Sequence, residues 1–167
     1  PRAVAAYRLI GYENRLLQDR DFNDDAKDAG DMGAGHSVTT LYELIPAGEK
    51  VEGPGIDPLK YQRPPVPSDA ARAGETMTVK VRYKEPESTV STLTSVSVAT
   101  TRTTTPALEF ASAVAEFGML LRDSEFKGAS SYAELRRRAA RSKGEDRFGH
   151  RAEFLRLVDV AESLTAL

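Results

Sequence analysis

The 167-residue chain has no cysteine and only two histidines, His36 and His150. Without cysteine it can form neither disulfides nor thiolate metal sites, and two histidines supply few of the ligands that zinc prefers. No apolar run approaches the ~20 residues that span a bilayer, and no signal-peptide pattern opens the chain. Direct insertion into a membrane is therefore not expected.

A strong excess of charge is also missing. The 23 basic and 25 acidic residues leave a net charge of −2, so no global attraction to nucleic acid or to an anionic membrane is expected. Hydrophobic residues make up 40% of the chain and charged residues 29%. This composition is typical of a globular protein, and the length suits one domain, or one domain with a small helical appendage.

The hydrophobic pattern changes near Thr105. Before it the period is two, and after it the period is close to 3.6. The first part predicts strands at residues 5–12, 37–45, 76–83 and 93–99, the last two forming a hairpin. The strand at 5–12 is apolar on both faces, which indicates a strand with neighbours on both sides. If a neighbour is absent, its edge is expected to self-associate or to be covered by the chain's own Pro-rich loop.

The strand at 76–83 alternates strictly, with Thr78, Lys80 and Arg82 on the side expected to face solvent. Its other side is predicted to be buried against the first helix. The residues of this predicted sheet face and of the helix opposite it are Met77, Val79, Val81, Tyr83, Phe110, Val114 and Phe117.

Three helices are predicted after Thr105. Thr105 can cap the first, with Pro106 at its first position, and Ser131 opens the second, which ends near Gly144. The third runs from about residue 151 to 164. The stripes expected to be buried are Phe110, Val114, Phe117 and Leu121 on the first helix, and Phe154, Leu157, Val158, Ala161 and Leu164 on the third.

These elements predict an α+β fold. An antiparallel, β-sandwich-like sheet over residues ~5–100 is followed by a helical segment of about three helices packed on it. Residues 1–105 form the β region and 106–167 the helical region, together one compact unit. A Pro-rich loop at 48–75 interrupts the β region, and is either a binding loop or a mobile excursion.

The segment from Glu13 to Asp31 carries seven acidic residues against three basic ones. Asp21, Asn23 and Asp25 have the spacing that begins a calcium-binding loop, but Ala26 and Met32 occupy the positions of its glycine and its bidentate glutamate. We interpret the segment as a short helical turn capped by Asn23 or Asp24, and weak calcium binding stays open.

His36 is a candidate catalytic base beside Ser37 and the acidic segment. Neighbouring residues on a strand point to opposite faces, so these two do not form a nucleophile and its base, and no G-x-S-x-G is present. A structural role for His36, bonded to backbone or carboxylate, is the favoured interpretation.

A basic segment follows in the helical region, opposed by only Glu145 and Asp146. Its members are Arg136, Arg137, Arg138, Arg141, Lys143, Arg147 and Arg151. Few aromatic residues accompany it, so a solvated helix face, which could face the acidic segment, is favoured over partner binding and over nucleic acid.

Several sequence blocks resemble a known family. They include Y-R-L-I-G-Y-E-N-R at 7–15, D-F-N-D-D-A-K-D-A-G at 21–30, G-A-G-H at 33–36, L-Y-E-L at 41–44 and T-V-K-V-R-Y-K at 78–84. The chain resembles the C-terminal domain of bacterial YfbK-type von Willebrand factor A (VWA) proteins over most of its length. The family-motif residues that are candidates for interaction are Arg8, Tyr12, Glu13, Asn14, Arg15, Asp24, Asp25, Asp28 and His36.

The resemblance implies an upstream VWA domain in the same polypeptide, whose D-x-S-x-S metal site is not found in this chain, and a strand before the equivalent of Pro1. It also implies an extracytoplasmic location and no established activity. We therefore expect a non-enzymatic accessory domain without cofactor or catalytic residues. It would orient the VWA domain or support protein–protein interaction. The alternatives are a hydrolase-like site around His36 and the acidic segment, and a ligand-binding module that uses the Pro-rich loop.

Overall fold

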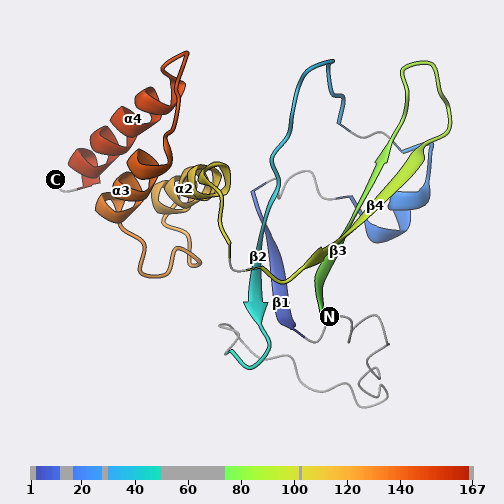
Figure 1. Cartoon of the computed structure of the whole chain (residues 1–167), viewed down its shortest axis with the longest axis horizontal. Coiled ribbons are helices and arrows are strands. Elements are labelled where there is room, and N and C mark those ends of the chain that lie inside the picture. The colour runs from blue at the N-terminus through green and yellow to red at the C-terminus, as the bar shows by residue number, and fades with distance from the viewer. Residues whose placement is uncertain (1–2, 12–16, 28–29, 50–73, 102, 166–167) are drawn as a thin grey trace. The chain divides into compact units, whose positions relative to one another are not determined.

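The computed structural model describes residues 3–11, 17–27, 30–49, 74–101 and 103–165. The chain divides into two units, Pro1–Thr101 and Arg102–Leu167, which we call the β unit and the helical unit. Antiparallel strands occupy the first unit and three helices the second (Figure 1). The predicted α+β class, with the helices at the C-terminus, is confirmed.

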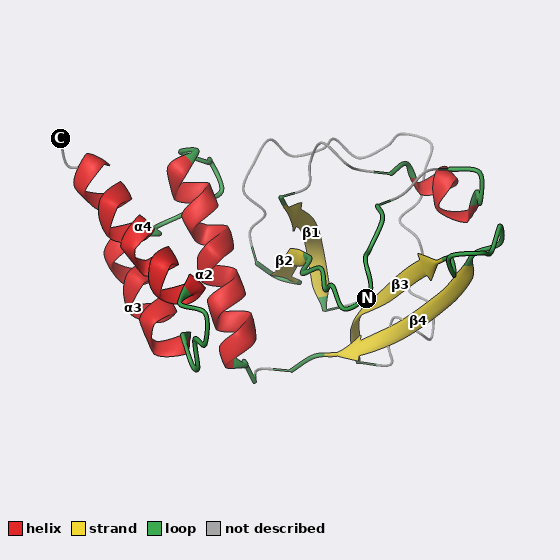
Figure 2. Cartoon of the chain, turned by 90° about the horizontal axis from the view of Figure 1, so that it is seen from above, coloured by secondary structure: helices red, strands yellow, loops and turns green. Residues whose placement is uncertain are grey.

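The β unit contains two antiparallel sheets of two strands each, drawn as yellow arrows in Figure 2. In the first, β1 (Val4–Ile10) pairs with β2 (Leu41–Pro46), and Tyr7 lies opposite Leu44. In the second, β3 (Glu75–Tyr83) pairs with β4 (Thr92–Ala99), and Val79 lies opposite Val96.

β1 is predicted to have neighbours on both sides. Among the described residues it pairs with β2 alone, and the Tyr7 side chain is 73% exposed. The second expected neighbour is therefore not found among the described residues; the family resemblance places it in a strand before the equivalent of Pro1, and it stays a prediction. β2 also begins at Leu41 rather than at Ser37. Leu41 is the partner of Ile10, and Gly11, with φ +77°, follows the end of β1.

The predicted burial of one face of β3 is also wrong. Val79, Val81 and Tyr83 are all exposed, with Val81 at 52%, and Val96 across the ladder is exposed as well. Alternation shows that these side chains share a face of the strand, but burial requires another layer over that face. No such layer buries it within the described residues.

The helical unit consists of α2 (Pro106–Leu121), α3 (Tyr132–Ser142) and α4 (His150–Thr165). Both predicted N-caps are confirmed. The Thr105 hydroxyl accepts a hydrogen bond from the Leu108 amide at 3.2 Å, and the Ser131 hydroxyl accepts one from Glu134 at 3.3 Å. None of the helices in the described ranges is both long enough and apolar enough to cross a membrane.

The core of the helical unit lies where the three helices meet. Ala113, Leu135, Ala139 and Val158 are completely buried. The Phe154 ring makes edge-to-face contacts with Phe110 and with Phe117, each at a centroid distance of 5.4 Å, and such pairs stabilise a core beyond the area they bury.

The side chains predicted to be buried on α2 and α4 are only partly the ones that the structure buries. Val114, Leu121, Leu157 and Leu164 are exposed, whereas Ala113 and Leu120 complete the buried side of α2. Because α2 is apolar around much of its circumference, hydrophobicity alone does not show which of its sides packs against the other helices.

Candidate functional site

The acidic segment contains a short 3-10 helix, η2 (Asp19–Asn23), which lies beside the β3–β4 hairpin (Figures 1 and 2). Asp24, one of the two predicted caps, begins the turn that follows η2, because the Lys27 amide donates to the Asp24 carbonyl at 3.1 Å. Gln18 precedes the helix without a capping hydrogen bond, and Asp24 follows its end. The Asp24 carboxylate accepts a hydrogen bond from the Ala26 amide at 3.0 Å, which is an Asx-turn. Asp24 therefore ends η2 and caps the next turn, so the predicted cap is confirmed, whereas the 3-10 helix before it was not predicted.

Asp25 attaches this segment to the hairpin. The Ser91 amide donates to the Asp25 carboxylate at 3.2 Å, and the Lys84 ammonium donates to the Asp25 backbone carbonyl at 2.5 Å. Hydrogen bonding by the Ser91 side chain is the main reason that the pKa of Asp25 lies below its ordinary value. Desolvation opposes this shift, and the positive charges of Lys84 and Arg82 add to it.

Arg82 completes the attachment, although the alternation placed it on a solvent-facing side. It is half-buried; its guanidinium donates to the Ser91 hydroxyl at 2.6 Å and lies 5.8 Å from the centroid of the Phe22 ring. Sequence reasoning missed Phe22, Arg82 and Ser91. Asp25 and Ser91 are 66 residues apart, and no local pattern records so distant a pair.

An open groove of about 620 Å³ lies between the acidic segment and the end of the hairpin. Its polar lining includes Asp21, Asp24, Asp25 and Asp31 together with Lys27, Arg82 and Lys84. Its apolar lining is Leu17, Phe22, Met32, Val81, Tyr83 and Pro86. A groove with apolar walls and a few charged groups suits a side chain or a small amphipathic ligand better than a nucleic acid.

The calcium-like spacing of Asp21, Asn23 and Asp25 is used for protein contacts. Asp21 forms ion pairs with Arg20 and Lys27, each at 3.7 Å, and Asp25 binds Ser91. Across the described ranges no group of three or more His, Cys, Asp or Glu side chains is placed to hold a metal ion. The contacts support the interpretation of this segment as a structural turn.

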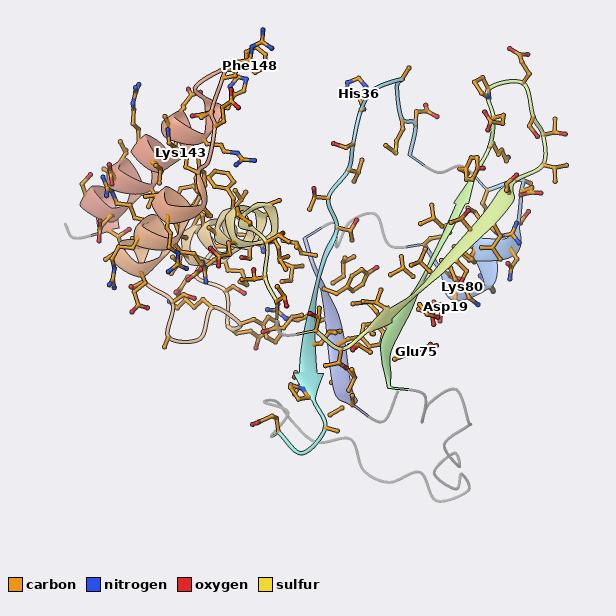
Figure 3. The ribbon with its side chains drawn as sticks, viewed as in Figure 1. Asp19, His36, Glu75, Lys80, Lys143 and Phe148 are labelled. Carbon is orange, nitrogen blue, oxygen red and sulfur yellow. The ribbon has the colours of Figure 1, made fainter. Side chains whose placement is uncertain are left out.

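His36 belongs to a separate turn. Its amide donates to the Gly33 carbonyl at 3.1 Å, and its imidazole lies so close to Gly33 that a Cβ there would be 2.7 Å from Nδ1. The side chain is exposed and does not line the groove, and Figure 3 shows His36 well apart from Asp19 of η2. His36 is therefore not brought to the acidic side chains, and its structural role, with the imidazole bonded to backbone or carboxylate, stays a prediction.

The other predicted site residues are dispersed or lie outside the described ranges. Arg8 on β1 forms an ion pair with Glu43 on β2 at 2.5 Å. Tyr12, Glu13, Asn14, Arg15 and Asp28 lie outside the described residues. Of the nine candidates, the structure therefore brings only Asp24 and Asp25 together at the groove.

The basic segment forms ion pairs within the helical unit. Arg136 pairs with Asp159 of α4, Arg138 with the buried Glu116 of α2, and Arg141 with Glu109 of α2 at 3.5 Å. The ion pair with Asp159 raises the pKa of Arg136. Three of these arginines therefore connect α3 to α2 and α4 through ion pairs. The positive charge that they could offer to an anionic polymer is reduced accordingly.

Two two-stranded antiparallel sheets, an acidic segment bound to the second of them and three C-terminal helices define an α+β protein. The family comparison is specific: the model of "Uncharacterized protein YfbK, C-terminal" matches residues 1–164, and the chain belongs to this family. The resemblance noted from the sequence blocks is confirmed.

A curated relative, "Uncharacterized protein YfbK" of Escherichia coli (strain K12), is 37% identical over 166 residues. The match covers 99% of this chain but only 28% of the relative, so the chain corresponds to a part of that longer protein. No solved structure matches the chain.

Proposed function

We propose that this chain is a non-enzymatic accessory domain that docks onto an adjacent VWA domain of the same polypeptide and holds it in one orientation. The observation that carries the proposal is the outer edge of β1, which pairs with β2 alone among the described strands. The length of the E. coli relative supports it, because 28% coverage leaves room for further domains in such a protein.

The physical basis is the incomplete sheet. A two-stranded hairpin is only marginally stable in water, and an edge strand offers backbone N–H and C=O groups that can pair with an added strand. A third strand beside β1 would satisfy those groups and extend the sheet. This is the recognition mode known as β-augmentation, in which backbone hydrogen bonds supply affinity and side chains supply specificity.

The side chains near this edge suit an interface. Tyr7 and Tyr42 are exposed on the β1–β2 sheet, with ring centroids 6.5 Å apart. Tyrosine is enriched at protein interfaces, because it buries a large apolar ring and keeps a polar hydroxyl. The proposal includes an extracytoplasmic location, with any anchoring signal outside this chain, and no role in nucleic-acid binding.

The two alternative functions have less support. A hydrolase would need His36 near the acidic side chains, and His36 does not line their groove. The ligand-binding module depends on a Pro-rich loop, of which residues 50–73 lie outside the described part of the chain.

Hydrogen exchange tests the docking role. The amides from Ala5 to Ile10 are compared in this chain and in a longer polypeptide that includes the preceding sequence of the same protein. Protection of these amides is expected to rise sharply in the longer polypeptide, because the edge of β1 is then paired. The β3 amides from Thr78 to Arg82 are the internal control and should not change. Equal protection of β1 in both polypeptides, in a monomer at all concentrations, would contradict the docking role.

A further inference from the structure

The loop that joins α3 to α4 carries the most exposed large apolar side chain among the described residues. Phe148 is 75% exposed, and Figure 3 places it at the tip of this loop. A phenyl ring in water contributes nothing to the core of its own unit. Single exposed apolar residues are common on protein surfaces, but large aromatic side chains are also frequent anchors at the centre of protein interfaces.

Hydrogen bonds hold the loop in one conformation. The Asp146 carboxylate accepts from the amides of Arg151 and Ala152 at 3.2 and 2.8 Å, and the Gly149 amide donates to the Asp146 carbonyl at 3.1 Å. Burial alone would raise the pKa of Asp146, but these amides outweigh it and the pKa is lowered. The Arg151 guanidinium also donates to the Lys143 carbonyl at 2.7 Å. Binding through Phe148 would therefore cost little ordering entropy.

The neighbours of Phe148 specify the partner's chemistry. The Arg147 guanidinium lies 5.4 Å from the ring centroid, and the His150 ring lies 6.1 Å away. Lys143 adds a further positive charge, the exposed Glu145 opposes it, and the Asp146 carboxylate is turned to backbone amides of its own loop. A cationic aromatic tip of this kind matches an apolar pocket with carboxylates on its rim.

The groove on the β unit has apolar walls and a small excess of carboxylates. Phe22, Met32 and Tyr83 supply apolar walls, and four carboxylates and three cations line the groove, among them the carboxylates of Asp24 and Asp31. Lys27 is paired with Asp21, whereas Arg82 and Lys84 are held by neutral groups and keep their charge. Its volume of about 620 Å³ is ample for a phenyl ring.

We infer that Phe148 and Arg147 of one copy of this chain bind the groove between the acidic segment and the β3–β4 hairpin of a second copy. The two surfaces differ, so the contact is heterologous. Each added copy leaves one tip and one groove unused, and assembly proceeds to longer oligomers or closes into a ring. This mode is separate from pairing at the edge of β1, and neither depends on the other.

Sedimentation velocity of the purified chain over about 5 to 500 µM tests this contact, since weak specific association falls in that range. We expect association that rises with protein concentration and weakens in high salt, because charged pairs surround the ring. Phe148→Ala should weaken association at least about tenfold, as removal of a central aromatic anchor does. Leu164→Ala is the matched control, since Leu164 is also an exposed apolar residue of the helical unit and lies at the end of α4.

Charge reversal identifies the two surfaces. Arg147→Glu and Asp31→Arg should each weaken association, and the double variant should recover most of it. A chain that is monomeric at every concentration overturns the inference. So does association that Phe148→Ala leaves unchanged, as pairing at the β1 edge would, or a double variant that associates no better than either single one.

Discussion

The two units of this chain differ in how they are stabilised. All of the buried side chains among the described residues belong to the helical unit, where Leu135 and Val158 are completely covered and Glu116 is paired with Arg138. No described side chain of the β unit is buried. Its described parts are held by strand ladders and by the polar contacts of Asp25, Arg82 and Ser91.

The helical unit therefore buries its own hydrophobic core, whereas the β unit leaves large apolar side chains exposed. Three amphipathic helices can bury their stripes against each other. Two sheets of two strands each cannot bury both of their faces, and an isolated two-stranded sheet is only marginally stable in water. The exposed valines of β3 and the edge of β1 therefore favour a role for the β unit in contacts with other parts of a larger protein.

The largest expected effect contrasts the two cores directly. Leu135→Ala removes a side chain with no exposed surface and should lower the free energy of unfolding of the helical unit by about 2–5 kcal/mol. Val81→Asp places a charge on a half-exposed position and should cost about 0.5 kcal/mol. Urea unfolding followed by circular dichroism measures both. A Val81→Asp variant as unstable as Leu135→Ala would show that this face of β3 is covered after all.

A smaller effect is expected from the attachment of the acidic segment. The pKa of Asp25 in the folded chain lies below its ordinary value of 3.8. Its contribution to stability is therefore complete above about pH 4 and is lost as the pH falls through the lower, folded-state pKa. Exchange of the Ser91 amide should accelerate relative to its intrinsic rate in that acidic range.

Two variants sharpen this test. Asp25→Asn should remove the acid dependence at Ser91, because the side chain no longer titrates. Asp24→Asn is the control, since its hydrogen bond to Ala26 is local to the segment. The same acid response in Asp25→Asn would mean that another group holds the segment to the hairpin.

The smallest expected effect is that of calcium. The carboxylates of Asp21 and Asp25 already have protein partners, so millimolar calcium should leave the melting temperature of the chain unchanged. A ligand that binds only the native state must raise that temperature. A rise with calcium that is absent with magnesium would overturn the structural interpretation of the acidic segment.

Local elements of the fold could be predicted from the sequence. Thr105 and Ser131 begin helices where their hydroxyls can cap them, and strand alternation located β3 and β4 to within one residue at each end. These features depend on interactions between residues a few positions apart. The cap at Asp24 was predicted as well, but the 3-10 helix that precedes it was not, because no capping pattern marks its start at Gln18.

The candidate site was predicted less well. The sequence blocks indicated Asp24 and Asp25 as candidates for interaction, but they did not indicate the residues that these side chains bind. Ser91, Arg82 and Phe22 carry no motif, and Arg82 was expected to face solvent. The basic face on α3 was likewise visible in the sequence, while its pairing with Glu109, Glu116 and Asp159 was not.

By itself the sequence determined the family, the α+β class, the helix caps and the pairing of β3 with β4, since all of these depend on local patterns or on matching blocks. Only the tertiary structure decided which side of α2 is buried, that Asp25 binds Ser91, and that β1 has one partner among the described strands. The reason is physical. Periodicity reports which residues share a face, whereas burial and long-range hydrogen bonds depend on what is packed against that face.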